Sequence, residues 1–218
     1  MKLNLNFVSE YISNVKRPSP NISPSSVFYK TNEILHEIGF QAQRFQSLNN
    51  EYFYVCYSTF DDSLTKDKTF NWHPKESRFF WQIVRHLFKN LSENASKFKI
   101  DDEDSLIDLF SMERKETENL KHDGLTHLMI DSLIVKWLEE NYLQAVNSNQ
   151  ITLGVRTLGE MNQLLTKKFS LLDCKHCRLI CFVGYYCDAC DVIYHNKCCE
   201  TMKCNECNKD MGTLRLFI

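Results

Sequence analysis

This sequence of 218 residues lacks several features that would define its class at once. It has no apolar run near the roughly 18 residues that a membrane-spanning helix needs, so no membrane association is predicted. Its N-terminus has no apolar signal core, so we expect no secretory signal. The formal net charge is only −2, and no segment is strongly basic. Charge therefore gives no reason to expect direct binding of nucleic acid or of a membrane surface.

Familiar catalytic motifs are also missing. The sequence contains no phosphate-binding loop, no dinucleotide fingerprint and no nucleophile elbow. Five scattered histidines lie at no recognisable catalytic spacing from a cysteine or serine, and we interpret them as surface or core residues. These are His36, His73, His86, His122 and His127. Cys56 falls in an aromatic, strand-like run, which predicts a small buried hydrophobe.

The sequence does have cysteine, concentrated near one end. Nine of its ten cysteines lie between residues 174 and 207. Seven of them, with one histidine, form four pairs that each enclose two residues: Cys174 and Cys177, Cys187 and Cys190, His195 and Cys198, Cys204 and Cys207. Each pair can place two ligands on one tight turn, as tetrahedral zinc requires. Because a histidine has no role in a disulfide framework, the pattern predicts zinc and a reducing compartment, the cytosol or nucleus.

Eight ligands predict two zinc ions, which could be held by sequential pairs or in a cross-brace. The gaps of four and five residues between the later pairs are short for two independent beads, and this favours the cross-brace. Cys174, Cys177, His195 and Cys198 would then hold the first ion, and Cys187, Cys190, Cys204 and Cys207 the second. Protein fills every coordination position, which argues against metal-assisted hydrolysis.

Two further thiols and one imidazole lie beside these ligands. Cys199 could replace Cys198 in principle, but only Cys198 has the required spacing from His195. Cys181 is interpreted as a thiol of the small core and His176 as an exposed side chain.

The first part of the chain, residues 1–60, predicts a helix followed by a hairpin. A short apolar stretch at 7–12 and a proline-rich loop precede a helix from about residue 25 to 38. Two strand-like runs follow at 40–45 and 51–58, joined by a turn at 47–50. Residues 61–74 are polar and read as a linker.

The next part, residues 75–170, predicts three helices, a hairpin and a last helix. The first helix carries an apolar stripe at helical spacing: Phe79, Phe80, Ile83, Val84, Leu87, Phe88 and Leu91. The later elements are expected at 105–112, 124–139, 142–146, 151–154 and through Leu158, Met161 and Leu165. This order is that of a winged-helix domain, and residues 1–60 read as a shorter version. The third helix is poor in cations, so it is expected to face protein rather than DNA.

The last part, residues 171–218, is the predicted zinc domain. It is too small to be held by an apolar core alone. Zinc would supply the deficit, about 10–16 kcal/mol for each structural site. The expected fold class is therefore α+β, with two winged-helix units followed by a small C-terminal cross-brace, RING-like zinc domain.

At this level the chain resembles a known family. The segments Cys174-Lys-His-Cys177, Cys187-Asp-Ala-Cys190, His195-Asn-Lys-Cys198 and Cys204-Asn-Glu-Cys207 match the variant RING of the first non-SMC element of the SMC five/six complex. The stretch from Ile151 to Met161 also resembles the wing and last helix of that family. The likeness covers roughly residues 25–210.

The resemblance implies a nuclear, chromosome-associated ubiquitin ligase subunit that acts in DNA repair and recombination. Its winged helices would bind a MAGE-type subunit within a kleisin-containing SMC five/six complex, and it would meet DNA only indirectly. The RING would perform no covalent chemistry. It would position a charged ubiquitin-conjugating enzyme, with Leu179 and Ile180 as a possible docking surface.

The sequence departs from many active RINGs at His176, which precedes the second ligand, and at Asn205 and Asn208, which follow the seventh and eighth. A second hypothesis is therefore a non-catalytic assembly module in which the zinc domain buttresses complex formation. A third is a histone-reading zinc finger, which shares the ligand order. Met202 stands where that class usually has an aromatic residue.

Overall fold

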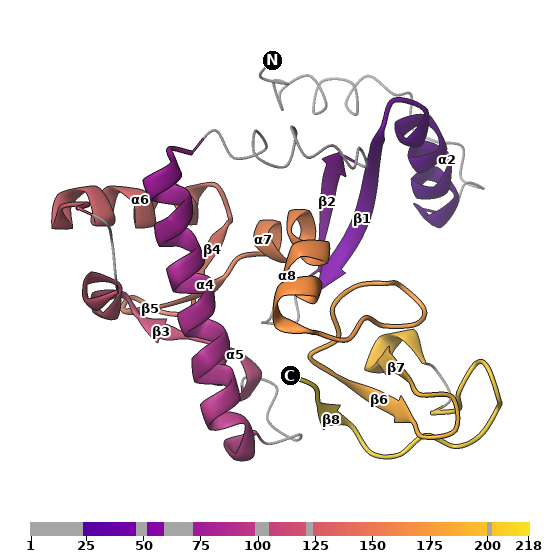
Figure 1. The fold of residues 1–218 in the computed structure, drawn as a ribbon. Helices are drawn as coiled ribbons and strands as arrows, with labels where there is room; N and C mark the ends of the chain where they lie inside the picture. The colour runs from indigo at the N-terminus through magenta and orange to yellow at the C-terminus, as the bar shows by residue number, and fades with distance from the viewer. Residues whose placement is uncertain (1–23, 47–51, 59–71, 99–104, 121–123, 200–201) are drawn as a thin grey trace. The chain divides into compact units, whose positions relative to one another are not determined.

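The computed structural model describes residues 24–46, 52–58, 72–98, 105–120, 124–199 and 202–218 (Figure 1). Contacts divide the chain into two compact units, Met1–Ala42 with Ser58–Phe60, and Gln43–Tyr57 with Asp61–Ile218. The predicted apolar stretch at 7–12, the turn at 47–50 and most of the 61–74 linker lie outside the described residues. Within the described part, no helix is both long and apolar enough to cross a membrane.

The first described elements are a helix and two strands, as predicted. Helix α2 (Pro24–Glu37) is followed by Gly39, whose φ of 74° is a conformation that glycine adopts without strain. Strands β1 (Phe40–Gln46) and β2 (Tyr52–Ser58) form a two-stranded sheet. Asn32 of α2 exchanges two hydrogen bonds with the backbone of Ala42, at 2.7 and 2.8 Å, which ties the helix to the start of β1.

The side chain of Cys56 is exposed, so its interpretation as a buried hydrophobe is wrong. Successive strand residues point to opposite faces. In β2, Val55 is half-buried while its neighbours Tyr54 and Cys56 are exposed.

Helix α4 (Pro74–Asn94) is the longest described element and the centre of the packing. His73 accepts a hydrogen bond from the Lys75 amide, and Glu76 reaches back to the His73 amide, which completes a capping box. All seven apolar side chains of the predicted stripe are buried. The helical periodicity therefore predicted both the element and its inward face.

Four short elements and another helix follow: the 3₁₀-helix η1 (Ala95–Lys97), α5 (Ser105–Leu109), β3 (Met112–Glu113), the 3₁₀-helix η2 (Arg114–Asn119) and α6 (His127–Glu139). The expected helix to residue 112 is too long, because Met112 leaves the helix and pairs with Ile151 as an edge strand. Helix α6 begins later than expected because Thr126 caps it, accepting a hydrogen bond from the Met129 amide at 3.3 Å.

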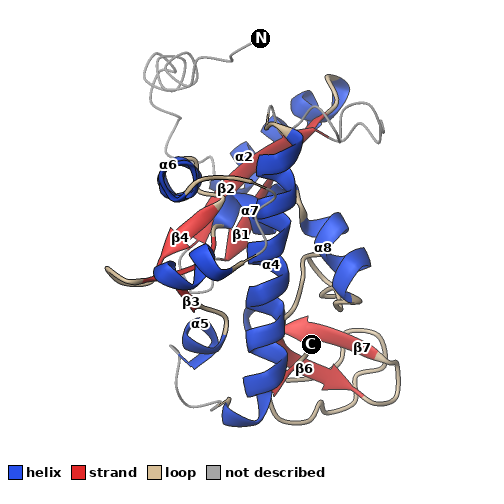
Figure 2. Cartoon of the chain, turned by 60° about the vertical axis from the view of Figure 1, so that its left-hand side comes forward, coloured by secondary structure: helices blue, strands red, loops and turns tan. Residues whose placement is uncertain are grey.

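Strands β4 (Leu143–Ala145) and β5 (Gln150–Leu153) form the predicted hairpin, and β3 adds a third strand in the order β3-β5-β4. The last expected helix is two helices, α7 (Val155–Glu160) and α8 (Asn162–Phe169), separated at Met161. In both views α4 lies between this sheet and α8 (Figures 1 and 2). We use "central segment" for residues 72–170, which contain all these elements from α4 to α8.

Two groups of aromatic rings fill the core of the central segment. Trp137 is fully buried against Trp72 and Phe80, with ring centroids 5.4 and 5.1 Å away. At the other end of α4, Phe88 stacks on Phe169 of α8 at 3.9 Å, which fixes α8 against α4. Ring pairs of this kind add about 0.5–1.5 kcal/mol beyond the area they bury.

In the C-terminal segment, residues 171–218, the described residues form a small sheet. Strands β6 (Val183–Cys187), β7 (Val192–His195) and β8 (Arg215–Leu216) pair antiparallel in the order β7-β6-β8. The described residues thus mix helices and strands, and the cysteine-rich segment follows the helical one, as the predicted fold class requires.

Candidate metal centre

The eight predicted ligands gather into two groups of four. Cys174, Cys177, His195 and Cys198 form the first group; Cys187, Cys190, Cys204 and Cys207 form the second. Within each group the potential ligand atoms all lie within 4.8 Å of one another. These are the two sets that a cross-brace produces, and sequential pairing would have produced different ones.

Three of the four close pairs sit on the same kind of turn. The residue after each second cysteine has a positive φ: 61° for Arg178, 54° for Asp191 and 58° for Asn208. Its amide donates to the carbonyl of the first cysteine at 2.8 to 2.9 Å in all three turns. This geometry brings both sulfurs of a pair to one side of the turn.

The hairpin of β6 and β7 explains why the groups are interleaved. Cys187 ends β6 and pairs with Val192, whereas His195 ends β7 and pairs with Gly184 at the other end of the hairpin. Three strand residues span about 10 Å. One hairpin therefore delivers Cys187 to one group and His195 to the other.

The imidazole of His195 is oriented by both of its nitrogens. Nδ1 lies 3.3 Å from Cys177 Sγ and 3.9 Å from Cys198 Sγ, whereas Nε2 lies 2.9 Å from the Ile180 carbonyl oxygen. A carbonyl can only accept, so Nε2 carries a proton and Nδ1 is the nitrogen left to bind a metal among the sulfurs. That tautomer suits a metal bound through Nδ1.

The second group is packed into the small core of the C-terminal segment. Cys187 Sγ lies 3.6 Å from Cys207 Sγ, far beyond the length of a disulfide bond. The buried Tyr194 places its hydroxyl 4.0 Å from Cys204 Sγ. All ten cysteines of the chain are free thiols, which agrees with metal ligation rather than a disulfide framework.

Crowding sets the ionisation of these thiols. In the first group, hydrogen bonds from Cys177 and Cys198 hold the pKa of Cys174 far below its usual range. In the second, burial opposes ionisation of Cys204, but the backbone amides of Cys207 and Glu206 lower its pKa to about 6. Ionisation of the neighbouring Cys190 is disfavoured, because a hydrogen bond with Cys207, followed by burial, raises its pKa to about 12. A divalent cation at the centre of the group would favour the ionised form of these thiols.

The donor sets fit zinc. One group offers three thiols and an imidazole, the other four thiols, and both are ligand sets of closed structural zinc sites. Such a site stabilises a fold and leaves no position for a reacting water. Bound zinc would hold the turns of residues 174–178, 187–191 and 204–208 in place.

The neighbouring thiols lie outside both groups. Cys199 is buried, and its sulfur donates to the Lys203 carbonyl at 3.1 Å, so Cys198 rather than Cys199 joins the first group. Cys181 is buried and donates to the Val183 carbonyl at 3.4 Å, as expected of a core thiol. His176 is exposed, as predicted.

Leu179 and Ile180 are each only 8% exposed, so they offer no docking surface in this structure. Leu179 packs with Val155 of α7, and Ile180 belongs to the core of the central segment. The sequence identified both as apolar residues beside a ligand turn. It gave no sign that the central segment would cover them.

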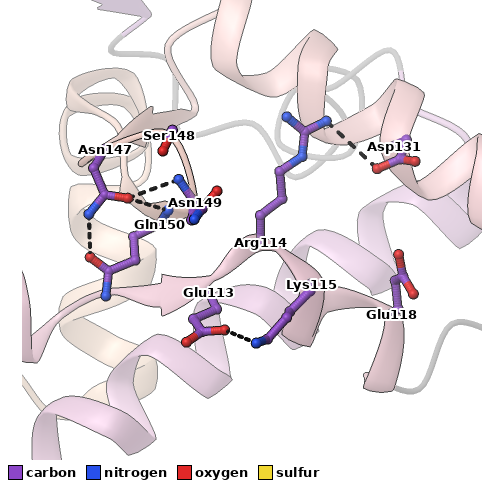
Figure 3. Close-up of a pocket in the computed structure, with 9 residues that line it drawn as sticks. All are labelled: Glu113, Arg114, Lys115, Glu118, Asp131, Asn147, Ser148, Asn149 and Gln150. Atoms are coloured by element: carbon purple, nitrogen blue, oxygen red, sulfur yellow. Dashed lines mark hydrogen bonds and ion pairs between the residues drawn. The ribbon is translucent and has the colours of Figure 1, made fainter.

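A polar cavity of about 700 Å³ lies in the central segment (Figure 3). It is lined by Glu113, Arg114, Lys115, Glu118, Asp131, Asn147, Ser148, Asn149 and Gln150. Lys115 pairs with Glu113 at 2.7 Å and Arg114 with Asp131 at 3.7 Å, and both pairs are drawn in Figure 3. Because its cations already face carboxylates, the cavity offers polar contacts rather than a reactive centre.

Exposed apolar side chains lie on α6, the helix that supplies Asp131 to this cavity. Leu128 is 82% exposed, and Met129 and Val135 are exposed as well. The only lysine or arginine of α6 is Lys136. This composition suits contact with a protein better than contact with phosphates.

The scattered histidines form no catalytic arrangement among the described residues. His73 caps α4, while His86 and His127 lie 3.8 and 3.5 Å from Glu116 and Glu118. The sequence also gave no hint of Asn162, whose side chain bonds the backbone beside the first group. That contact joins residues 16 and 18 positions apart and depends on how α8 packs.

No protein-family model matches this sequence, and no curated protein matches it. Among solved structures, one chain of the "Nse1-Nse3-Nse4 complex" is similar, with a TM-score of 0.55 and 14% sequence identity. The match covers 86% of this chain and 78% of that one. At this identity the likeness speaks for the fold. The chain therefore shares the fold of a subunit of that complex, as its resemblance to the first non-SMC element predicted.

Proposed function

We propose that this chain is a RING-type ubiquitin ligase subunit of an SMC five/six complex, nuclear and chromosome-associated, acting in DNA repair and recombination. The observation that carries the proposal is the interleaved pair of Cys/His groups beside a fold shared with a chain of the "Nse1-Nse3-Nse4 complex". Two zinc ions held by the eight residues would make the C-terminal segment a variant RING. It would act by positioning a charged ubiquitin-conjugating enzyme, not by covalent chemistry.

The central segment supports a winged-helix reading. Helices α4, α5 and α6 precede the β4–β5 hairpin, which would be the wing, and strand β3, which lies between α5 and α6 in the chain, adds a third strand to it. The shorter helix and hairpin of α2, β1 and β2 would be a reduced version. We propose that the exposed apolar side chains of α6, with the polar cavity beside them, bind a MAGE-type subunit. A kleisin would complete the complex, and contact with DNA would be indirect.

The docking of a conjugating enzyme needs an exposed apolar surface. Within the described part of the C-terminal segment, the exposed large apolar side chains are Leu172, Met202 and Ile218. Docking would have to use these, because Leu179 and Ile180 are buried.

That burial favours a second candidate function, a non-catalytic assembly module. In this function, zinc would only stabilise the fold of the C-terminal segment. Ile180 and Phe182 would stabilise the core of the central segment, which would bind the partners. The two functions share the zinc sites and the partners and differ in ubiquitin transfer.

The deciding experiment is co-expression with the MAGE-type partner, followed by ubiquitin-chain formation over a panel of conjugating enzymes. His195→Ala removes a ligand of the first group, and His176→Ala removes an exposed histidine of the same segment as a matched control. Activity that survives His176→Ala but not His195→Ala supports the ligase. An intact complex that is silent over the whole panel supports the assembly module.

A further inference from the structure

A ligand of the first metal group is hydrogen-bonded to the backbone of Ile180, whose side chain lies in the core of the central segment. The protonated Nε2 of His195 donates to the carbonyl of Ile180 at 2.9 Å. That bond fixes the ring plane and keeps Nδ1 aimed at the sulfurs of the group. Outer partners of a ligating histidine typically change metal affinity by about 10- to 100-fold when they are lost. The position of the Ile180 backbone is therefore part of the site.

The side chain of Asn162 holds the backbone of Ile180 from the other side of its Cα, at the peptide group that carries the Ile180 N–H. Its Oδ1 accepts the Ile180 amide proton at 3.1 Å, and its Nδ2 donates to the Arg178 carbonyl at 3.5 Å. Arg178 is the positive-φ residue that closes the turn of Cys174 and Cys177. One amide side chain thus bridges the end of the ligand turn and the backbone of Ile180, the residue whose carbonyl orients His195.

Asn162 is held in place by the packing of α8. It is the first residue of α8, whose Leu165 is fully buried and whose Phe169 stacks on Phe88 of α4. Its side chain does not cap its own helix, because the N-cap position is Met161 and no side-chain cap bond is present there. The two hydrogen bonds to the C-terminal segment are therefore not a by-product of starting α8.

The second metal group is supported differently. Among the described residues, its ligands bond to one another, to Tyr194 and to the backbone of their own turns, all within the C-terminal segment. A change at Asn162 should reach the second group only if the whole segment loosens. The metal affinity of the second group therefore serves as an internal reference for changes in the metal affinity of the first.

We propose that Asn162 is a positioning residue for the first metal ion, acting through Ile180 on the imidazole of His195. The proposal rests on the zinc loading proposed above. It gives the central segment a direct influence on the Cys₃His ion and leaves the Cys₄ ion to the C-terminal segment alone.

The test uses the full chain loaded with Co²⁺, whose visible absorption distinguishes a Cys₃His ion from a Cys₄ ion. Affinity is measured for each ion by chelator competition in the wild type, Asn162→Ala and Asn162→Asp. Gln163→Ala is the matched control, since it removes the neighbouring, exposed amide of α8. We expect Asn162→Ala to weaken the Cys₃His ion by about tenfold and to leave the Cys₄ ion unchanged. Asn162→Asp keeps the acceptor for the Ile180 amide and should restore most of the loss.

Equal weakening of both ions by Asn162→Ala would overturn the proposal, because it would mark a general loss of stability. No weakening of the Cys₃His ion would overturn it as well. A wild-type chain that binds no Co²⁺ at either group would instead contradict the zinc loading itself. Hydrogen exchange at His195 Nε2 gives a second readout: Asn162→Ala should speed it, and Gln163→Ala should not.

Discussion

The central segment and the C-terminal segment are stabilised by different interactions. In the central segment, α4 alone buries seven large apolar side chains, and rings such as Trp137 and Phe80 are fully enclosed. The buried cluster of the C-terminal segment consists mainly of cysteines with Ile193, two tyrosines and Met211. Apolar burial stabilises the first of these segments, whereas the second would depend on the zinc ions proposed above.

The boundary between the two buried clusters does not coincide with the boundary between the two segments in the sequence. Ile180 and Phe182 come after the first ligand pair, yet both belong to the central core. Phe182 lies 5.3 Å from Phe110, measured between ring centroids. The C-terminal segment is therefore built onto the central one through a few apolar side chains and the bonds of Asn162.

Removing the metal should have the largest effect and act on one segment. Each structural zinc site contributes about 10–16 kcal/mol in small zinc domains, so chelation should unfold residues 171–218. Hydrogen exchange with mass spectrometry should show lost protection over β6 and β7, while α4 keeps its own. Loss of protection over α4 to the same degree would contradict the contrast between the segments.

Phe182→Ala changes a residue of the C-terminal segment but should destabilise the core of the central segment. It removes a buried ring from the central core and should lower the free energy of unfolding by about 3–5 kcal/mol. Urea denaturation followed by tryptophan fluorescence reports this, because Trp72 and Trp137 both lie in the central core. Phe217→Ala, in the other cluster, is the control and should cost less. An unchanged midpoint for Phe182→Ala would show that the ring does not contribute to that core.

Two glycines test the segments with the same chemical change. A Cβ at Gly154 would lie 2.2 Å from the Asn141 oxygen, and one at Gly184 would lie 2.4 Å from the Tyr194 oxygen. Overpacking of this kind costs about 1–3 kcal/mol. Gly154→Ala should lower stability and leave metal content unchanged. Gly184→Ala distorts the ligand hairpin and should lower metal content. Gly212→Ala, where the nearest atom is a side-chain end at 3.4 Å, is the control.

Leu128→Ser should have the smallest effect on stability, within about 0.5 kcal/mol, because the side chain is exposed. If α6 binds the MAGE-type partner, affinity for that partner should fall by about tenfold, measured by calorimetry. Leu172→Ser, an exposed leucine of the C-terminal segment, should leave that affinity unchanged. Equal losses in both variants would remove α6 from the interface.

Local patterns predicted what local physics determines. The periodicity of α4 gave its buried face, and the spacing of the ligand pairs gave the two groups that the structure brings together. The failures are contacts between distant residues. A two-residue strand such as β3 exists only because Ile151 lies opposite Met112. Nothing near Leu179 or Asn162 in the sequence reveals that the central and C-terminal segments meet at them.

Counting the metal ions bound to the full chain shows whether the eight cysteine and histidine residues form two zinc sites. Native mass spectrometry of the wild type, Cys187→Ala, His195→Ala and His176→Ala separates the two groups from an exposed bystander. We expect two zinc ions in the wild type and in His176→Ala, and fewer than two when Cys187 or His195 is replaced. Two ions retained in either ligand variant, or none in the wild type, would contradict this expectation.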